Sequence, residues 1–465
     1  MKKSAKLLLL SDTLTRLRAS SLLQLNEQGS TVRATMLEVL RQWALEQLPE
    51  PEATELADRH GAWIEQLVRE AYTHAELRSE ALWATRLDNE LSNLRQALEY
   101  ASTNNAPRFL ELTRRLTWYW ESRGYSSEGV EWLQKALARN PVPETAARLL
   151  GDMALLQVRR SDSATALELV EQALALNPEP PLRARLVHIR AYAYFRNGQA
   201  EAALEAAQQA LILIQPLNLP LDETRMQATV GAVLRDLGRF DEATSAMERA
   251  IALGRASDSG RALAGALNNL AALHHVLSRD GADSLFAEAA ILYNALGFQS
   301  GVAVISMNRS VMASRAERWK DAEEFILDAI GRLRPLQERR HLATALSTLA
   351  QILIEMGRLD EALEPLQESL ETRWSLGNPH SIMITLLVVS RYFYRNDKLP
   401  QAAQILGMAQ FYRDSMGRPI PPDEAREWEQ HLASFPASER EGSFEVGRTL
   451  SSEEREKKIL EFLAL

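Results

Sequence analysis

The sequence Gly238-Arg239-Phe240-Asp241-Glu242-Ala243 returns later in the chain as Gly357-Arg358-Leu359-Asp360-Glu361-Ala362. In both copies a second small residue follows the alanine by seven positions, Ala250 in the first and Ser369 in the second. Glycine commonly ends a helix, acidic residues favour the first turn of the next helix, and small residues let two helices approach closely. The stretch therefore predicts a helix pair, and its recurrence predicts a stacked array rather than one globular core.

Eight units of the chain carry this pair of small residues at the same separation. Successive units are 37, 37, 40, 39, 40, 40 and 40 positions apart, by subtraction of their first small residues. Those first small residues are Gly129, Ala166, Ala203, Ala243, Ala282, Ala322, Ala362 and Ala402. Twelve positions before each of them lies a third residue, which is small in every unit but one; the eight are Thr117, Ala154, Ala191, Gly231, Leu270, Ser310, Ala350 and Ser390. Three close-contact positions per unit indicate pairs of tightly packed helices.

The offsets of these three small positions resemble those of the tetratricopeptide repeat. The usual unit of that repeat is about 34 residues long, so units of 37 to 40 residues imply longer helices. The resemblance implies an all-α fold, a tetratricopeptide-like α-solenoid in which helix pairs form a right-handed superhelix.

Composition and charge limit the function classes. The 465 residues include no cysteine, and the net charge is −9. A disulfide framework, a thiolate nucleophile and a cysteine-based metal site are therefore excluded, and a broad nucleic-acid-binding surface is not expected. The apolar run Leu7-Leu10 that follows the basic start is too short for a signal peptide, and no stretch is long enough to span a membrane. We expect a soluble, cytoplasmic protein.

The pattern divides the chain into four parts. Residues 1–48 read as a partial winged-helix-like segment: a helix, a hairpin with a turn at Asn26-Glu27-Gln28-Gly29, and a helix from Met36. A hairpin that only caps the array explains the same pattern equally well. Residues 49–106 form a helical connector in which Trp63 and Trp83 are expected in the core, 107–410 hold the eight repeats, and 411–465 form a C-terminal helical cap. In that cap Ser451-Ser452-Glu453-Glu454 predicts a capping box; alternatively, its last apolar residues contact a dimer partner.

Five segments in order resemble the region after the nucleotide-binding module in bacterial STAND ATPase regulators of the LuxR and AfsR-like kind. The segments are Met36-Leu37-Glu38-Val39-Leu40-Arg41-Gln42-Trp43-Ala44, Arg59-His60-Gly61-Ala62-Trp63, Leu87 to Leu98, Trp118 to Leu133, and Leu406-Gly407 to Ser451. The resemblance implies the tetratricopeptide-repeat sensor half of such a regulator.

The chain departs from these regulators in two respects. It contains no Gly-x-x-x-x-Gly-Lys-[Ser/Thr] motif, so the residues that hold nucleotide phosphates are absent. The winged helix also lacks its first helices. Neither ATP hydrolysis nor sequence-specific DNA binding is therefore expected, and the ATPase or DNA-binding half would come from another chain or have been lost by truncation.

Catalytic and metal-binding patterns are absent from the sequence. None of the eight histidines forms a His-x-x-x-His pair, and no Gly-x-Ser-x-Gly motif occurs. We therefore expect no enzymatic activity, no metal and no cofactor.

Candidate binding residues follow from the resemblance to the tetratricopeptide repeat. The resemblance implies that the first helix of each pair lines the concave side, and residues spaced i, i+3, i+4 and i+7 share the inner face of that helix. Several of the residues so placed are arginines, which suit carboxylates and phosphates, or aromatic residues, which suit planar or apolar groups. The predicted groove residues are Arg148, Arg185, His188, Tyr192, Arg225, Arg235, Asn268, His275, Gln351, Arg391 and Tyr394. The alternative is that these arginines pair with carboxylates of neighbouring repeats.

The sequence thus predicts a non-enzymatic regulatory sensor or scaffold. Its groove would recognise a protein or peptide partner, or a small anionic effector, with no direct nucleic-acid or membrane contact. A component of a transcriptional regulator is the alternative, and a homo-oligomer through the C-terminal helices is a further possibility.

Overall fold

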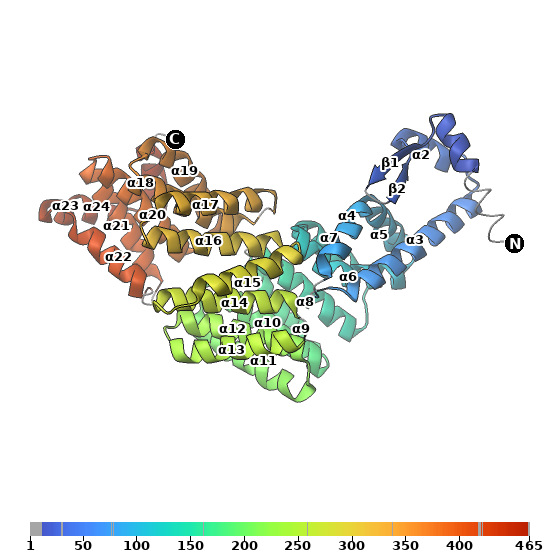
Figure 1. The fold of residues 1–465 in the computed structure, drawn as a ribbon, viewed down its shortest axis with the longest axis horizontal. Coiled ribbons are helices and arrows are strands. Elements are labelled where there is room, and N and C mark those ends of the chain that lie inside the picture. The colour runs from blue at the N-terminus through green and yellow to red at the C-terminus, as the bar shows by residue number, and fades with distance from the viewer. Residues whose placement is uncertain are drawn as a thin grey trace.

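A computed structural model of the chain describes residues 12–28, 31–75, 77, 79–160, 162–257, 259–336, 338–416, 420 and 422–463. Helices dominate these residues, and Figure 1 shows them stacked side by side into a long curved array. The N-terminal hairpin lies at one end of the molecule and the helices α22 to α24 lie at the other (Figure 1). The prediction of an all-α solenoid is confirmed.

The N-terminal segment has the predicted order of helix, hairpin and helix. Residues 12–19 are helical, β1 (Gln24–Gln28) pairs antiparallel with β2 (Thr31–Thr35), and α2 (Glu38–Glu46) follows. The turn prediction is wrong for Asn26 to Gln28, because β1 continues through Gln28, which pairs with Thr31. Gly29, like the signal-peptide-like start at residues 1–10, lies outside the described residues.

The connector consists of α3 (Glu50–Tyr72), α4 (Glu80–Asn89) and α5 (Leu91–Asn104). The helical spacing that runs from Ala75 to Tyr100 is divided between two helices, which meet at Glu90. Trp63 is 48% exposed, so its assignment to the core is wrong, whereas Trp83 is half-buried and stacks on His74 at 4.9 Å.

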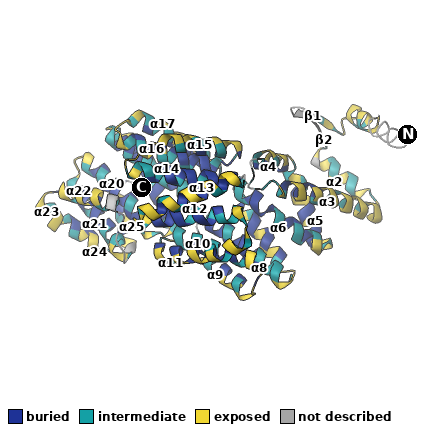
Figure 2. Cartoon of the chain, turned by 60° about the horizontal axis from the view of Figure 1, so that its bottom comes forward, coloured by how far each residue is buried: buried dark blue, intermediate teal, exposed yellow. Residues whose placement is uncertain are grey.

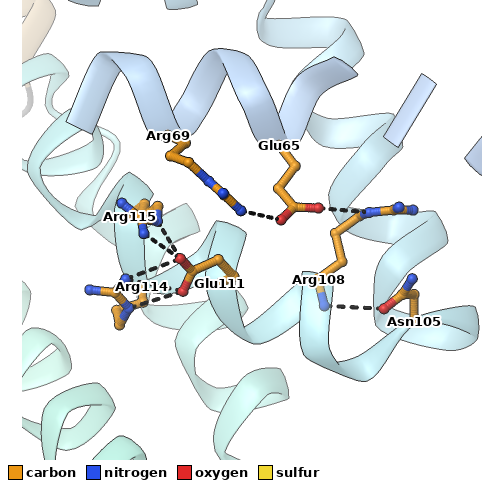
Figure 3. Close-up of polar contacts among 7 residues, drawn as sticks. All are labelled: Glu65, Arg69, Asn105, Arg108, Glu111, Arg114 and Arg115. Atoms are coloured by element: carbon orange, nitrogen blue, oxygen red, sulfur yellow. Dashed lines mark hydrogen bonds and ion pairs between the residues drawn. The ribbon is translucent and has the colours of Figure 1, made fainter. Parts of the chain in front are cut away.

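Ion pairs fasten the connector to the first helix of the array, as Figure 3 shows. Nε of Arg108 on α6 donates to Glu65 of α3 at 3.2 Å, and Glu65 also accepts from Arg69 at 2.9 Å. Nearby, Glu111 accepts from Arg114 and Arg115, which lie on the same helix one turn further along. The start of α6 is thus fixed against α3 by charged contacts.

The array comprises eight helix pairs among the described residues, α6/α7 through α20/α21. Most paired helices are joined by three residues, while α14 and α15 are joined by five, Leu277 to Gly281. The bounds are α6 Ala106–Arg123, α7 Ser126–Leu137, α8 Pro143–Arg159, α9 Ser163–Ala175, α10 Pro180–Arg196, α11 Ala200–Ile214, α12 Pro220–Asp236, α13 Phe240–Ala256, α14 Gly260–Val276, α15 Ala282–Ala295, α16 Gln299–Arg315, α17 Trp319–Leu333, α18 Arg339–Glu355, α19 Leu359–Leu376, α20 Pro379–Arg395 and α21 Leu399–Ser415. Short 3₁₀ helices, η1 (Gln215–Leu217) and η2 (Arg334–Leu336), extend α11 and α17.

The repeated small residues lie where paired helices touch. All eight residues of the first set are buried, from Gly129 to Ala402. A Cβ added to Gly231 would lie 2.6 Å from Met247, which leaves no room for a larger side chain. Figure 2 shows the buried residues concentrated between the helices, with exposed residues on the outer faces.

Serine at a close-contact position adds a hydrogen bond to the packing. Oγ of Ser310 donates to the carbonyl oxygen of Ala322 at 2.7 Å, and Oγ of Ser390 donates to that of Ala402 at 2.8 Å. In both pairs a small residue of the first helix bonds the first small residue of the second helix. The hydroxyl is therefore satisfied inside an apolar contact, as a buried polar group must be.

The C-terminal helices cover the last repeat. They are α22 (Pro422–Ala433), α23 (Ala437–Glu441), α24 (Ser443–Thr449) and α25 (Ser452–Phe462). The capping box at Ser451 and Glu454 is present as predicted. Leu463 is buried and Phe462 packs on Phe393, so these apolar residues contact the array rather than forming a free strip. The proline-rich sequence Gly417-Arg418-Pro419-Ile420-Pro421-Pro422 predicts an extended linker before α22, but residues 417–419 and 421, like Leu465, lie outside the described residues.

Curvature of the array brings distant repeats into contact. Arg261 at the start of α14 bonds Glu80 of α4 and Glu121 of α6, which precede it by 181 and 140 positions. Nη1 of Arg196 at the end of α10 lies 3.4 Å from Nε2 of His341 on α18. The inner side of the solenoid is therefore enclosed between its own helices.

Candidate functional site

A cavity of about 360 Å³, which we call the main cavity, lies on this inner side. Its walls come from six first helices of the repeats, α6, α8, α10, α12, α14 and α16, together with Tyr293 of α15, Phe298 before α16 and His341 of α18. Four aromatic side chains, Tyr192, Phe195, Tyr293 and Phe298, provide much of its apolar surface. The lining charges are six arginines and one glutamate: Arg159, Arg185, Arg196, Arg225, Arg235, Arg261 and Glu121.

Carboxylates flank most of these arginines. Arg185 donates to Asp152 of the preceding repeat at 3.0 Å, Arg225 pairs with Asp222 at 3.2 Å, and Arg235 donates to Asp236 at 2.9 Å. The side chains of Arg225 and Asp222 are each 29% exposed. The carboxylate that Arg185 contacts belongs to the preceding repeat, whereas Asp222 and Asp236 lie on the same helix as Arg225 and Arg235, and all three arginines also line the cavity.

Four buried charges form a cluster at the mouth between α4, α6, α8 and α14. Glu121 accepts from Arg159 at 2.6 Å and from Arg261 at 3.2 Å, and Arg261 also bonds Glu80. Burial alone would raise the pKa of Glu121, but Arg159 and Arg261 lower it to about 2. Glu121 is therefore a carboxylate at neutral pH, and the four charges form an alternating arginine–glutamate network.

A second cavity of about 320 Å³ adjoins the first. Both are lined by Glu121, Leu155, Arg185 and Arg225, and the second also reaches Arg148. Arg148 makes no ion pair with the residues that the structure describes. Together the two cavities form one path along the inner face, and this arginine without an ion pair lies on that path.

The surrounding arginines lower the pKa values of His188 and Tyr192. Burial, with Arg225 and Arg185, lowers the pKa of His188 to about 3, so the imidazole is neutral and bonds the hydroxyl of Thr229 at 2.8 Å. Burial opposes ionisation of Tyr192, but Arg159 and Arg196 outweigh it and lower the pKa of the phenol. The site is thus electropositive without depending on a protonated histidine.

The structure brings six of the eleven predicted groove residues to this path: Arg148, Arg185, His188, Tyr192, Arg225 and Arg235. The other five lie elsewhere on the inner helices. Asn268 is buried and accepts from Asn308 of the next repeat at 2.9 Å, and burial with Arg315 lowers the pKa of His275. Gln351 is half-buried on α18 and lines neither cavity.

Arg391 and Tyr394 are occupied by the C-terminal cap. Arg391 donates to Glu427 of α22 at 3.2 Å, and the hydroxyl of Tyr394 donates to the carbonyl oxygen of Ser434 at 3.3 Å. Tyr394 also packs edge-on against His431 and Phe435. At this end of the array, therefore, the chain's own helices cover the inner face.

Sequence reasoning missed three cavity arginines, Arg159, Arg196 and Arg261. Arg159 and Arg196 end α8 and α10, one turn beyond the predicted positions, and Arg261 lies in the first turn of α14. The sequence could predict that these arginines lie near helix ends. It could not predict that they converge, because their convergence depends on the curvature of the whole array.

Two properties of the described residues bear on function. No cluster of histidine and acidic side chains there could hold a metal ion, and no helix there is long and apolar enough to cross a membrane.

Comparison with known proteins identifies the repeat. Residues 301–373 match the model of the tetratricopeptide repeat. The array is a tetratricopeptide-type solenoid. No curated protein matches the chain by sequence.

The chain is similar to several solved structures at low sequence identity. A Rap protein complexed with competence and sporulation factor is 9% identical, with 70% of this chain and 96% of that chain covered at a TM-score of 0.51. NprR in complex with its cognate peptide NprX is 12% identical to this chain. The match covers 71% of this chain and 99% of that chain, with a TM-score of 0.45. A STAND protein with a tetratricopeptide repeat sensor from Pyrococcus horikoshii is 13% identical, with a TM-score of 0.46. The match covers 85% of this chain but only 57% of the length of the STAND protein. The similarity to the Rap protein shows a shared fold.

Proposed function

We propose that this protein is a non-enzymatic binding module whose inner cavities take an acidic segment of a protein or peptide partner. The observation that carries the proposal is the lining of the main cavity, six arginines and one glutamate beside four aromatic rings. Arginine forks bind carboxylates in a bidentate manner, and aromatic walls bind the apolar parts of a peptide. The Arg225–Asp222 pair is half-buried and lies within one helix, so a ligand carboxylate can take the place of Asp222 as a partner of Arg225.

The shape of the site favours an extended ligand. Each cavity alone, at about 360 and 320 Å³, is near the lower end for small-molecule pockets. Because they share Arg185 and Arg225, a short peptide can follow both, with one acidic side chain near Arg148 and another near Arg235. The fold is compatible with this use, since the Rap protein of the same architecture was solved as a complex with a factor.

The double variant Arg185→Ala, Arg225→Ala tests the proposal. We expect the dissociation constant for an acidic peptide to rise at least tenfold, about 1.4 kcal/mol, because two guanidiniums shared by both cavities are lost. The measurement is fluorescence anisotropy with labelled peptides selected from an array of acidic and neutral eight-residue sequences.

The matched control is Arg249→Ala, Arg255→Ala, which removes two arginines from exposed pairs with Glu223 and Glu288 outside both cavities. Its affinity should equal that of the wild type. Unchanged binding by the cavity variant, or an equal loss in the control, would show that the cavities do not bind the peptide.

A second candidate function is the sensing half of a transcriptional regulator that acts with a separate ATPase or DNA-binding chain. The observation in its favour is an exposed apolar face beside the hairpin: Leu37, Val39 and Trp43 are 56%, 77% and 61% exposed. Large apolar side chains gathered on one helix commonly mark a contact with another protein. Figure 2 shows how little of α2 is covered by the rest of the chain.

Substitution of this face tests the second candidate. We expect Val39→Asp with Trp43→Asp to abolish co-purification of a partner that carries a nucleotide-binding or DNA-binding module, as identified by mass spectrometry. The control Leu82→Asp, at a 71% exposed position on α4, should retain the partner. A partner of that kind that stays bound to the double variant would place its contact elsewhere.

A further inference from the structure

A third cavity, of about 470 Å³, lies where two distant parts of the array meet. We name this contact the seam; it joins the ends of α10 and α12 to the starts of α18 and α20. Nη1 of Arg340 donates to the backbone oxygen of Arg196 at 3.2 Å across it, over a separation of 144 positions. Arg196 lines both the seam cavity and the main cavity.

Three arginines gather at the seam without a carboxylate partner. Arg196 and Arg340 line the cavity, and Arg373 lies behind it, where Nη1 donates to the backbone oxygen of Ser381 at 2.7 Å and Nη2 to Thr344 at 3.3 Å. None of the three makes an ion pair with any residue that the structure describes. Nε of Arg196 and Nε of Arg373 are buried there without hydrogen-bond acceptors.

This arrangement contrasts with the arginines elsewhere in the array. Arg373 is only 5% exposed, and a buried charge without a partner is costly. Burial and the neighbouring Arg196 lower the pKa of Arg340 to about 9, and burial lowers that of Arg373 to about 10. The positive charges of Arg196 and Arg373 thus repel that of Arg340, and the Asp236 carboxylate compensates them only in part.

The acidic residues around the cavity are occupied or exposed. Asp236 accepts from Arg235 at 2.9 Å, Glu424 contacts His380 at 2.7 Å, and Glu201 is exposed. Glu338 contacts His341, the residue next to Arg340, at 2.6 Å. Asp236 lines the cavity and its charge acts on Arg340, but within the part of the chain that the structure describes no ion pair joins these carboxylates to the three arginines, so a bound anion can supply the missing contacts.

We propose that the seam cavity binds a phosphate group, free or carried on a small molecule, between Arg196 and Arg340, with Arg373 behind it. A dianion offsets two of the three positive charges of the cluster, and guanidiniums are well suited to phosphate oxygens. Bound phosphate joins the two parts of the array across the seam and stabilises the closed form of the solenoid. This inference is independent of the peptide-binding proposal.

The test is a titration of the full chain with inorganic phosphate at constant ionic strength, maintained with sodium chloride. We expect the thermal midpoint of the wild type to rise to a plateau as phosphate is added. Arg340→Gln and Arg196→Gln should each weaken phosphate binding at least tenfold, measured by calorimetry. Arg339→Gln is the matched control, since Arg339 is exposed and bonds Ser375, and it should bind as the wild type does.

A second readout separates loss of binding from loss of folding. In phosphate-free buffer Arg340→Gln should unfold at the same temperature as the wild type or higher, because an uncompensated charge has been removed. Arg185→Ala with Arg225→Ala should still bind phosphate, since these residues do not line the seam. Phenyl phosphate distinguishes the sources: tighter binding than inorganic phosphate assigns the site to an ester, and weaker binding assigns it to the free ion.

Three outcomes would overturn the proposal. The first is equal affinity of wild type and Arg340→Gln for phosphate. The second is an equal loss in Arg339→Gln, which would mean general charge screening. The third is a rise in thermal midpoint that sodium chloride reproduces without phosphate.

Discussion

Replacing Gly407 with alanine should detach the C-terminal helices from the array. A Cβ on Gly407 would overlap the carbonyl oxygen of Phe444, and one on Gly447 would overlap that of Gln404. α21 and α24 therefore touch backbone to backbone, and no rotamer change can make room. Overpacking of a fixed contact costs about 1–3 kcal/mol or more, and we expect the upper end here.

Hydrogen exchange is the suitable measurement, because a solenoid can open locally without unfolding as a whole. In Gly407→Ala the amides of α24 and α25 should exchange faster, while those of α10 to α13 should not change. Gly331→Ala is the control. Gly331 is a residue of α17, and a Cβ added there would meet no other atom, so alanine should stabilise that helix by about 0.5–1 kcal/mol. Normal protection of α24 in Gly407→Ala would mean that the close approach is not rigid.

The repeat was predictable from sequence because its signal is local. Small residues at a fixed spacing identify each helix pair, and Ser310 and Ser390 even occupy matching close-contact positions with matching hydrogen bonds. The inner face of each first helix was also predictable, because helical periodicity sets which side chains share a side. Six predicted residues, Arg185 and Arg225 among them, do line the cavities.

The closure of the array was not predictable in this way. It depends on small rotations between neighbouring repeats that add up over the array, and no single unit encodes their sum. Arg261 therefore looked like an ordinary first-turn residue, although it meets Glu80 across 181 positions. For the same reason Arg391 and Tyr394 could not be recognised as covered, since the covering helix α22 follows the repeats.

Arg261→Ala should open the solenoid and lower its stability markedly. Arg261 is buried, with 13% of its side chain exposed, and its partners Glu80 and Glu121 are 1% and 8% exposed. Removing one member of a buried network leaves uncompensated charge, which typically costs about 3–5 kcal/mol. Since this network joins α14 to α4 and α6, we expect a lower thermal midpoint and a larger radius of gyration by small-angle X-ray scattering.

Two comparisons decide whether the network itself is responsible. Arg279→Ala removes an exposed arginine, 44% accessible, from a loose pair with Asp241 at 3.7 Å, so its cost should be at most about 0.5 kcal/mol. The second comparison is acid stability. Because the pKa of Glu121 falls from 4.5 to about 2 on folding, its contribution is complete above about pH 4.5 and is lost as the pH falls toward 2. Arg261→Ala removes one of the arginines that lower this pKa, so the folded-state pKa of Glu121 should rise. The acid-dependent loss of stability should then be smaller, and complete at a higher pH, than in the wild type. Superimposable acid profiles would mean that Arg261 and Glu121 do not interact in solution.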